Sequence, residues 1–261
     1  PAQGRDQLPG VGHRALQVRT EEVHPQGGLG AALAQRQDMV LGLLAGRVLG
    51  LGPGQHRRRL AGVVAGQGGG DPALAPDVVV CSWGATNGSS TTFQTDVAAL
   101  LAAGIFPVFA AGNEGPNGGT LRSPASLPGV FAVGASDLYE SIASFSSRGP
   151  SPWGEVKPYV VAPGVEIRST LPGGTYGVLG GTSMATPHVG GVAALLRGIS
   201  STITISAMAQ VLTGTAIPLS TTIPNNASGW GRVDAYAATI AVAHPAVVSG
   251  TVGRSSGGAI A

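Results

Sequence analysis

The sequence predicts an α/β fold of three layers, with a mostly parallel sheet covered by helices, in roughly the last two-thirds of the 261-residue chain. From residue 77 onward, runs of aliphatic and β-branched residues alternate with segments of helical spacing, which is the pattern of a parallel sheet buried on both faces. Two other classes are excluded. The lone Cys81 cannot make a disulfide framework within the chain, and no apolar run approaches the ~20 residues that cross a bilayer.

Four buried strands are expected in this part of the chain. They are residues 77–82, 105–111, 130–135 and 160–162. The first is a nearly continuous run of β-branched residues, as in a strand with no solvent-facing side. Because parallel sheets place their ligand sites at the carboxyl ends of strands, the loops after Ser82, Ala111 and Ala135 are where we expect the chemistry.

Four helices are expected beside these strands. They are residues 91–103, 183–196, 205–214 and 233–242. In the first, Phe93, Val97, Leu100 and Leu101 recur at the spacing of one helix face. In the second, we expect Pro187 to lie in the first turn, where its missing N–H costs little.

Residues 1–75 differ sharply in composition from the rest of the chain. They contain no Ile, Ser, Asn, Lys or aromatic residue, whereas all of these types appear after residue 80. Residues 29–51 have some helix propensity, but repeated Gly weakens it. Without large side chains to fill a core, residues 1–70 are expected to be poorly packed or irregular.

The charge balance gives no sign of a nucleic-acid or membrane partner. The formal net charge is +2 and the pI is about 9.1, which reflects a small excess of Arg over 261 residues. Residues 57–59 are three consecutive Arg, but no aromatic residue accompanies them. We interpret them as a solvated loop.

The sharpest motif is the segment 180–189, which reads GGTSMATPHV. It places Ser183 at the start of a helix, where free N–H groups and the positive end of the helix dipole stabilise negative charge. Taken alone, this context favours Ser183 as a helix N-cap. An α/β-hydrolase elbow is excluded because Ala185 stands where Gly is required, and a phosphate-binding P-loop is excluded because its Gly-Lys-Ser/Thr is missing.

A second motif, Ala-Ala-Gly-Asn at residues 110–113, ends the second expected strand. The side-chain amide of Asn113 could donate a hydrogen bond to an oxyanion. Taken alone, Asn113 would be interpreted as a turn residue, since Gly115-Pro116 follows closely.

Together and in this order, the two motifs resemble the subtilisin-like serine proteases, the subtilases of peptidase family S8. The resemblance covers about residues 76–243, the carboxyl-terminal two-thirds of such a catalytic domain. Weaker matches lie at residues 77–84, 145–150, 162–164 and 229–235. The family implies a subtilisin-like fold whose amino-terminal part is missing or scrambled here.

The resemblance also implies an activity and site residues. It implies a secreted, monomeric serine endopeptidase that cleaves peptides or proteins through an acyl-enzyme on Ser183, without a cofactor in the chemistry. Asn113 matches the side-chain oxyanion donor, and the N–H of Ser183 the second donor. Calcium is common in the family, but no ligand cluster in this sequence matches a known site, so structural calcium stays unknown.

Two further segments match the substrate-binding parts of the family. Ser82, Trp83 and Gly84 match a strand edge that pairs with an extended peptide. Ala110, Ala111 and Gly112 match a wall of the pocket for the residue before the scissile bond.

The sequence departs from the family in the two other triad residues. The family mechanism needs a His that takes the hydroxyl proton and an Asp that orients the His. The family motifs that carry them, Asp-Thr/Ser-Gly and His-Gly-Thr-His, are missing upstream of Ser183. His188 cannot substitute, since five helical steps place it about 140° around the axis and ~7.5 Å along it.

Three hypotheses could explain this departure. Residues 1–75 could come from another reading frame of a GC-rich gene, the chain could be a subtilase-like peptide-binding or scaffold protein without a triad, or a fragment could be joined to unrelated sequence. As written, the chain is expected to be nearly inactive.

Residues 244–261 are expected to be a linker and the first strand of another domain. Residues 247–252 alternate in a strand-like way and resemble the start of a carboxypeptidase-regulatory-like β-sandwich. A disordered Ser/Gly tail is the alternative.

Overall fold

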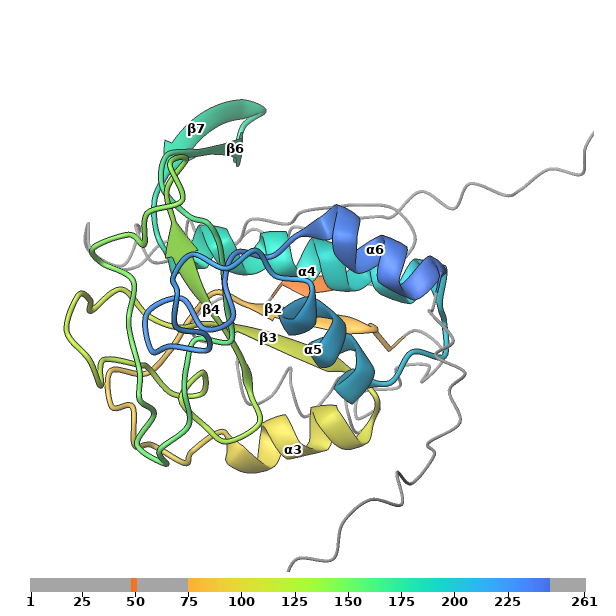
Figure 1. The fold of residues 1–261 in the computed structure, drawn as a ribbon, viewed down its shortest axis with the longest axis horizontal. Helices are drawn as coiled ribbons and strands as arrows, with labels where there is room; N and C mark the ends of the chain where they lie inside the picture. Colours follow the sequence, from red (N-terminus) through yellow and green to blue (C-terminus); the bar gives the residue numbers. More distant parts are fainter. Residues whose placement is uncertain (1–47, 51–74, 245–261) are drawn as a thin grey trace, which may run out of the picture.

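The computed structural model describes residues 48–50 and 75–244 (Figure 1). The expectations for residues 1–47, 51–74 and 245–261, including the second domain at the carboxyl end, lie outside the described residues.

Five parallel strands form the central sheet of the described residues (Figure 1). They are β1 (Val48–Gly50), β2 (Val78–Cys81), β3 (Phe106–Ala110), β4 (Phe131–Ser136) and β5 (Val160–Pro163). Their order in the sheet is their order in the chain, and each neighbouring pair is parallel. The mostly parallel sheet is thus confirmed, and β2 to β5 lie within a residue or two of the expected strands.

Strand β1 belongs to the compositionally unusual amino-terminal segment. Val48 pairs with Val78 and Gly50 with Val80, so β1 extends the sheet beyond β2. The helix propensity of residues 29–51 is therefore overridden at residues 48–50, where an extended chain can hydrogen-bond to an existing strand. A sequence pattern without aromatic residues or Ile did not exclude a strand here.

Alternate strand residues enter two different apolar layers. Val78 and Val80 pack in the layer of α4, α5 and α6, whereas Val79 and Cys81 pack in the layer of α3. This alternation follows from the two-residue period of a strand, whose successive side chains point to opposite faces. The result is the three-layer arrangement, with α3 below the sheet and α4 and α6 above it in Figure 1.

The four expected helices are present with small changes at their ends. They are α3 (Gln94–Ala102), α4 (Thr182–Ile199), α5 (Ile205–Gly214) and α6 (Ala235–Ala243). The hydroxyl of Thr204 caps α5 by accepting from the N–H of Ala207, and the Asp234 carboxylate caps α6 by accepting from the N–H of Ala237. Helix α4 is the central one and contacts β2, β3, β4 and β5.

A hairpin after β5 was not expected from the sequence. Strands β6 (Ile167–Leu171) and β7 (Thr175–Leu179) pair antiparallel and project from the body of the molecule (Figure 1). The sequence does carry the signal, because Ile-Arg-Ser-Thr-Leu is followed by Pro-Gly-Gly, with both turn glycines at positive φ. The alternation was missed because it spans only five residues on each side.

One lysine is completely buried beneath the sheet. The ammonium of Lys157 donates to the carbonyls of Ala125 (2.8 Å), Val130 (2.9 Å) and Leu127, and it pairs with the Glu155 carboxylate at 3.5 Å. Three donors thus meet three carbonyls of one turn, which compensates for the burial of the charge. This contact fixes the turn that leads into β4.

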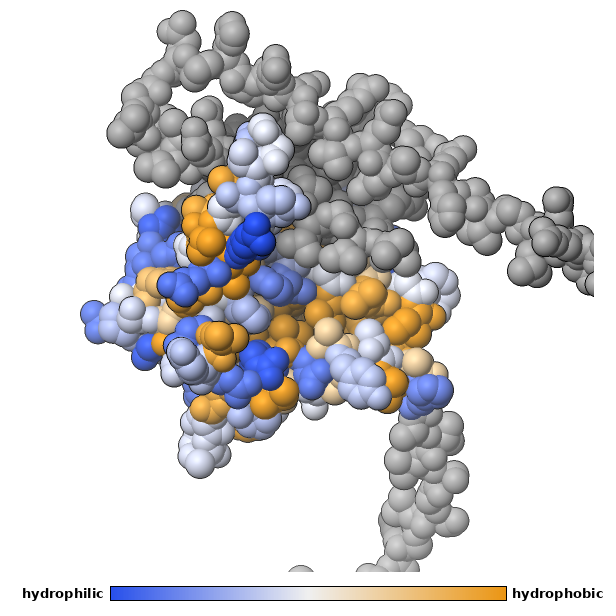
Figure 2. All heavy atoms as spheres, turned by 90° about the horizontal axis from the view of Figure 1, so that it is seen from above, coloured by the Kyte–Doolittle hydropathy of each residue, from blue (hydrophilic) through white to orange (hydrophobic). Residues whose placement is uncertain are grey.

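Apolar side chains gather on the surface where α6 and the end of α4 lie (Figure 2). Leu195, Ile199 and Ile240 are each more than a third exposed, and Ala238 is the buried residue of α6. None of the described helices is both long enough and apolar enough to cross a membrane.

Candidate functional site

Ser183 is the second residue of α4, at the carboxyl edge of the sheet. It is 7% exposed, and its hydroxyl donates to the carbonyl of Ser82 at 3.2 Å. The N-cap of the helix is Gly181, so the alternative interpretation of Ser183 as the cap is wrong. The helix start therefore presents Ser183 with its own N–H group among the donors that no helix carbonyl uses.

Asn113 follows β3 and is held in one orientation by the residue before Ser183. Its Oδ1 accepts from both the N–H and the hydroxyl of Thr182, each at 2.9 Å. Because a backbone N–H can only donate, the amide oxygen must face Thr182 and the Nδ2 group must turn away from it. The exposed Asn113 thus keeps an amide donor directed outward beside the start of α4.

The main chain around Asn113 is fixed by polar side chains that the sequence analysis did not identify. The Glu114 carboxylate accepts from the N–H of Asn113 at 2.9 Å, from the Ser147 hydroxyl at 3.2 Å, and forms an ion pair with Arg122. Gly112 has φ +116°, and a Cβ there would lie 2.6 Å from Glu114 Oε2. Only glycine fits this position without strain.

Of these residues, Thr182 and Ser147 lie inside motifs that the sequence did reveal. Thr182 stands directly before Ser183, and Ser147 lies in the 145–150 loop. Glu114 and Arg122 carry no signal of their own, since a surface ion pair has no pattern in a single sequence.

The segment from Ser82 to Gly84 passes beside the start of α4. The Trp83 side chain points away into the α3 layer, where it packs edge-to-face on Phe93 (4.9 Å) and Phe109 (5.6 Å). A Cβ at Gly84 would lie 2.8 Å from the Cβ of Arg122, so this position requires glycine. The Trp83 ring therefore belongs to the apolar layer of α3, and Gly84 leaves no space for a side chain beside Arg122.

Ala110 and Ala111 are buried at the end of β3, with 4% and 0% exposure. Ala110 pairs with Val133 of β4, and the carbonyl of Ala111 accepts from the N–H of Arg122. Together with Gly112, they connect the sheet to Asn113. Their assignment to a pocket wall stays a prediction.

The described residues include two histidines, and neither is hydrogen-bonded to the Ser183 hydroxyl, which donates to the carbonyl of Ser82. His188 makes a 2.8 Å hydrogen bond through Nδ1 with the carbonyl of Met184 in its own helix. His244 follows α6 as its C-cap. The exclusion of His188 as a base agrees with this geometry, and the triad Asp and His are not assigned to any described residue.

The sequence predicted Pro187 in the first turn of its helix, and this is wrong. Pro187 is the sixth residue of α4. The helix begins at Thr182, one residue earlier than expected, and its N-cap is Gly181 with a φ of +151°, which favours glycine. At this position the proline removes a helix hydrogen bond to the carbonyl of Ser183.

Two other kinds of reactive group are relevant, the free thiol of Cys81 and clusters of possible metal ligands. Cys81 is fully buried, and burial raises the pKa of its thiol, so it is a small apolar core residue as expected. In the part of the chain described here, no three His, Cys, Asp or Glu side chains gather in a way that could hold a metal ion.

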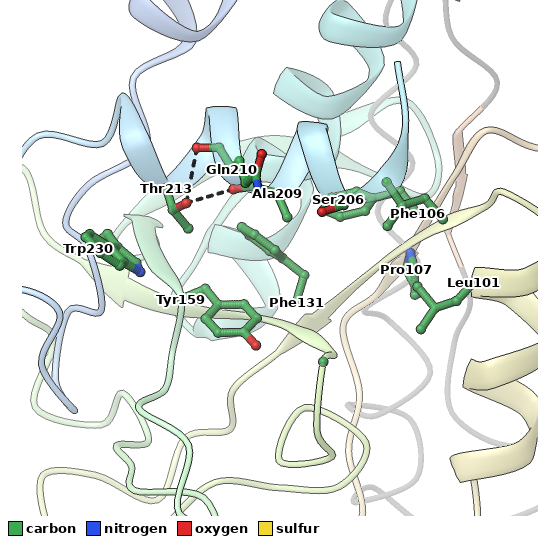
Figure 3. A pocket seen from close by; sticks show the side chains of 12 residues that line it. Leu101, Phe106, Pro107, Phe131, Tyr159, Ser206, Ala209, Gln210, Thr213 and Trp230 are labelled. Atoms are coloured by element: carbon green, nitrogen blue, oxygen red, sulfur yellow. Dashed lines mark hydrogen bonds between the residues drawn. The ribbon is translucent and has the colours of Figure 1, made fainter. Parts of the chain in front are cut away.

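A separate apolar pocket of about 520 Å³ lies at the opposite edge of the sheet (Figure 3). Phe106 and Phe131, which line it, are the first residues of β3 and β4, whereas Asn113 follows the last residue of β3. The rings of Tyr159 and Trp230 also border it. None of the candidate site residues lines it, so it is not part of the candidate site.

The known proteins that this chain is similar to include a bacillopeptidase and several subtilisins. The chain is 45% identical over 185 residues to bacillopeptidase F of Bacillus subtilis (strain 168), covering 67% of this chain and 13% of the relative. It is 46% identical over 142 residues to subtilisin of Bacillus pumilus (54% and 49%) and to subtilisin E of Bacillus subtilis (54% and 35%). The chain thus spans less than half the length of each of these relatives.

The sequence model of the subtilase family, Peptidase S8, matches residues 42–231. The match begins well before residue 76, where we expected the resemblance to start, and it includes β1. It contains Asn113 and Ser183, and it covers more than half of the chain. The chain therefore belongs to the subtilase family.

Proposed function

We propose that this chain is part of a serine endopeptidase that cleaves peptide bonds through an acyl-enzyme on Ser183. The observation that carries the proposal is the double hydrogen bond from Thr182 to Asn113 Oδ1, at 2.9 Å each. It couples the orientation of the amide donor to the helix residue next to the nucleophile. Such preorganised donors are the largest contribution to catalysis of acyl transfer.

In the proposed reaction, Ser183 Oγ attacks the peptide carbonyl carbon and loses its proton. The new oxyanion accepts hydrogen bonds from Asn113 Nδ2 and the N–H of Ser183. The C–N bond then breaks, the proton reaches the leaving amine, and water hydrolyses the ester in the reverse sequence. The base that carries the proton is the family's His, which we assign to no described residue.

An extended peptide is the proposed substrate, bound along residues 82–84. The Trp83 ring packs on Phe93 and Phe109 and so points away from this path, and pairing with the main chain of the segment would supply affinity for the peptide. Small residues at 110–112 leave room for a substrate side chain.

Further proposals rest on the family and, for the carboxyl end, on the sequence of residues 247–252. We expect a secreted, monomeric enzyme that needs no cofactor for its chemistry, while structural calcium stays open. We also propose that the chain continues into a carboxypeptidase-regulatory-like domain that begins near residue 246. A stop codon directly after Ala261 in the gene would contradict this last proposal.

A peptide-binding or scaffold protein is the second candidate function. It is favoured by the Ser183 hydroxyl, which donates to a main-chain carbonyl rather than to an imidazole.

A fluorogenic peptide separates the two candidates, with binding and cleavage measured for the native chain and for Ser183→Ala. The protease predicts slow cleavage that Ser183→Ala abolishes. Equal binding by both chains with cleavage by neither would favour the scaffold.

A further inference from the structure

Pro187 leaves a gap in the hydrogen-bond ladder of α4 at its second residue. In an α-helix the carbonyl of Ser183 would accept from the N–H of residue 187. Proline has no N–H, and its ring pushes against the carbonyl four residues earlier. Ser183 is only 7% exposed, and a carbonyl without a donor is costly at a buried position.

The Ser82 hydroxyl fills this gap from another element. It donates to the carbonyl of Ser183 at 2.8 Å, across 101 residues of sequence. The Ser183 hydroxyl donates in return to the carbonyl of Ser82 at 3.2 Å. Two reciprocal hydrogen bonds thus join the end of β2 to the first turn of α4.

The neighbouring carbonyls show that side-chain donors support the whole turn. The carbonyl of Thr182 accepts from the Thr186 hydroxyl at 2.7 Å, and that of Met184 interacts with His188 Nδ1 at 2.8 Å. Both of these donors lie in α4 itself. Of the donors to these three carbonyls, only Ser82 comes from outside the helix, so its hydroxyl joins the turn to the end of β2, as Thr182 joins it to Gly112 and Asn113 after β3.

We propose that Ser82 is a positioning residue whose hydroxyl replaces the helix N–H that Pro187 lacks, and that the two residues act as a unit to place Ser183. The proposal that Ser82 and Pro187 place Ser183 rests on geometry alone. The proposal that this placement affects catalysis rests on the proposed function. The shared bond fixes the Ser183 main chain, and hence its Oγ and N–H, relative to the strand segment proposed to bind substrate.

A double-mutant cycle tests this coupling. Ser82→Ala leaves the Ser183 carbonyl without a donor and is expected to raise the unfolding equilibrium constant roughly tenfold. In a Pro187→Ala background the helix supplies its own N–H, so Ser82→Ala is expected to have at most a twofold effect. Equal effects in both backgrounds would overturn the proposal. Ser82→Thr, which keeps the hydroxyl, is expected to restore the native value.

Carbonyl ¹³C NMR of Ser183 provides a readout that a general loss of stability would not change. Its resonance is expected to move in Ser82→Ala and to return in the Ser82→Ala/Pro187→Ala double variant. Thr186→Val is the matched control, because the Thr182 carbonyl keeps its main-chain helix donor. A Ser183 carbonyl signal that is the same in all variants would overturn the proposal.

The acylation rate separates this proposal from the proposed function. With a fluorophosphonate, Ser82→Ala is expected to lower the rate of adduct formation on Ser183 roughly tenfold, and Pro187→Ala to restore it. If no variant forms an adduct while the cycle and the NMR signal show coupling, the proposed function fails and the positioning role stands.

Discussion

At the scale of single residues, the site depends on the orientation of one amide. Asn113 Oδ1 has two donors, and both belong to Thr182. The hydroxyl of Thr182 also interacts with the main chain of Gly112, at 3.3 Å from its N–H. Thr182, which is completely buried, therefore orients the proposed oxyanion donor.

Thr182→Val removes the hydroxyl and keeps the backbone N–H as a donor to Asn113. We expect kcat to fall roughly tenfold with KM nearly unchanged, because the lost bond orients a group that acts in the transition state. Steady-state kinetics with a fluorogenic peptide measures the two constants. Thr182→Ser is the control and should retain most of kcat. A rise in KM with kcat unchanged would contradict the positioning role.

The sequence was sufficient to single out Ser183 and Asn113 but not the residues that hold them. A nucleophile at a helix start and an amide after a strand have recognisable sequence contexts. Thr182, Glu114 and Ser82 act through contacts between residues far apart in the chain. Those contacts depend on how β3 and α4 approach each other, which no local pattern records.

At the scale of elements, buried strands were predicted better than exposed ones. Strands β2 to β5 are buried on both faces and appear as continuous apolar runs, which few other structures produce. The hairpin β6–β7 is half-exposed and alternates over five residues only. Strand β1 depends on pairing with β2, so its own sequence carried little information.

The turn before β4 depends on the buried Lys157, and this contact predicts an unusual pH dependence. Burial lowers the pKa of Lys157 from 10.5 to about 8, against the opposing effect of Glu155. Between these values the unfolded chain holds a proton that the folded chain has lost. The free energy of unfolding should therefore rise with pH from about 8 to 10.5, by up to ~3 kcal/mol, with no such gain below pH 8.

Urea unfolding at one-unit steps from pH 7 to 11 measures this dependence. Lys157→Met removes the titrating group and leaves three carbonyls without their donor, so it should be less stable at pH 7. The pH dependence of the unfolding free energy of this variant is the control for the titration of all other groups. Parallel profiles for the two proteins would contradict the assignment.

At the scale of the whole molecule, the two apolar layers and the parallel sheet place Ser183 and Asn113 at one edge. Asn113 follows the carboxyl end of β3, and α4 packs across all five strands of the described sheet so that its amino end lies beside Asn113. The apolar pocket of Figure 3 lies at the other edge. The position of the candidate site therefore follows from the architecture, and this pocket plays no part in it.

The central claim is that Ser183 is a nucleophile with an oxyanion site formed by Asn113, and mass spectrometry after incubation with a fluorophosphonate tests it most directly. We predict one slowly formed adduct, on Ser183, absent in Ser183→Ala. In Asn113→Ala it should form ~10²–10³-fold more slowly, the range already measured for such a donor in a subtilisin. An adduct on another residue, no adduct, or a rate that Asn113→Ala does not change would contradict the account.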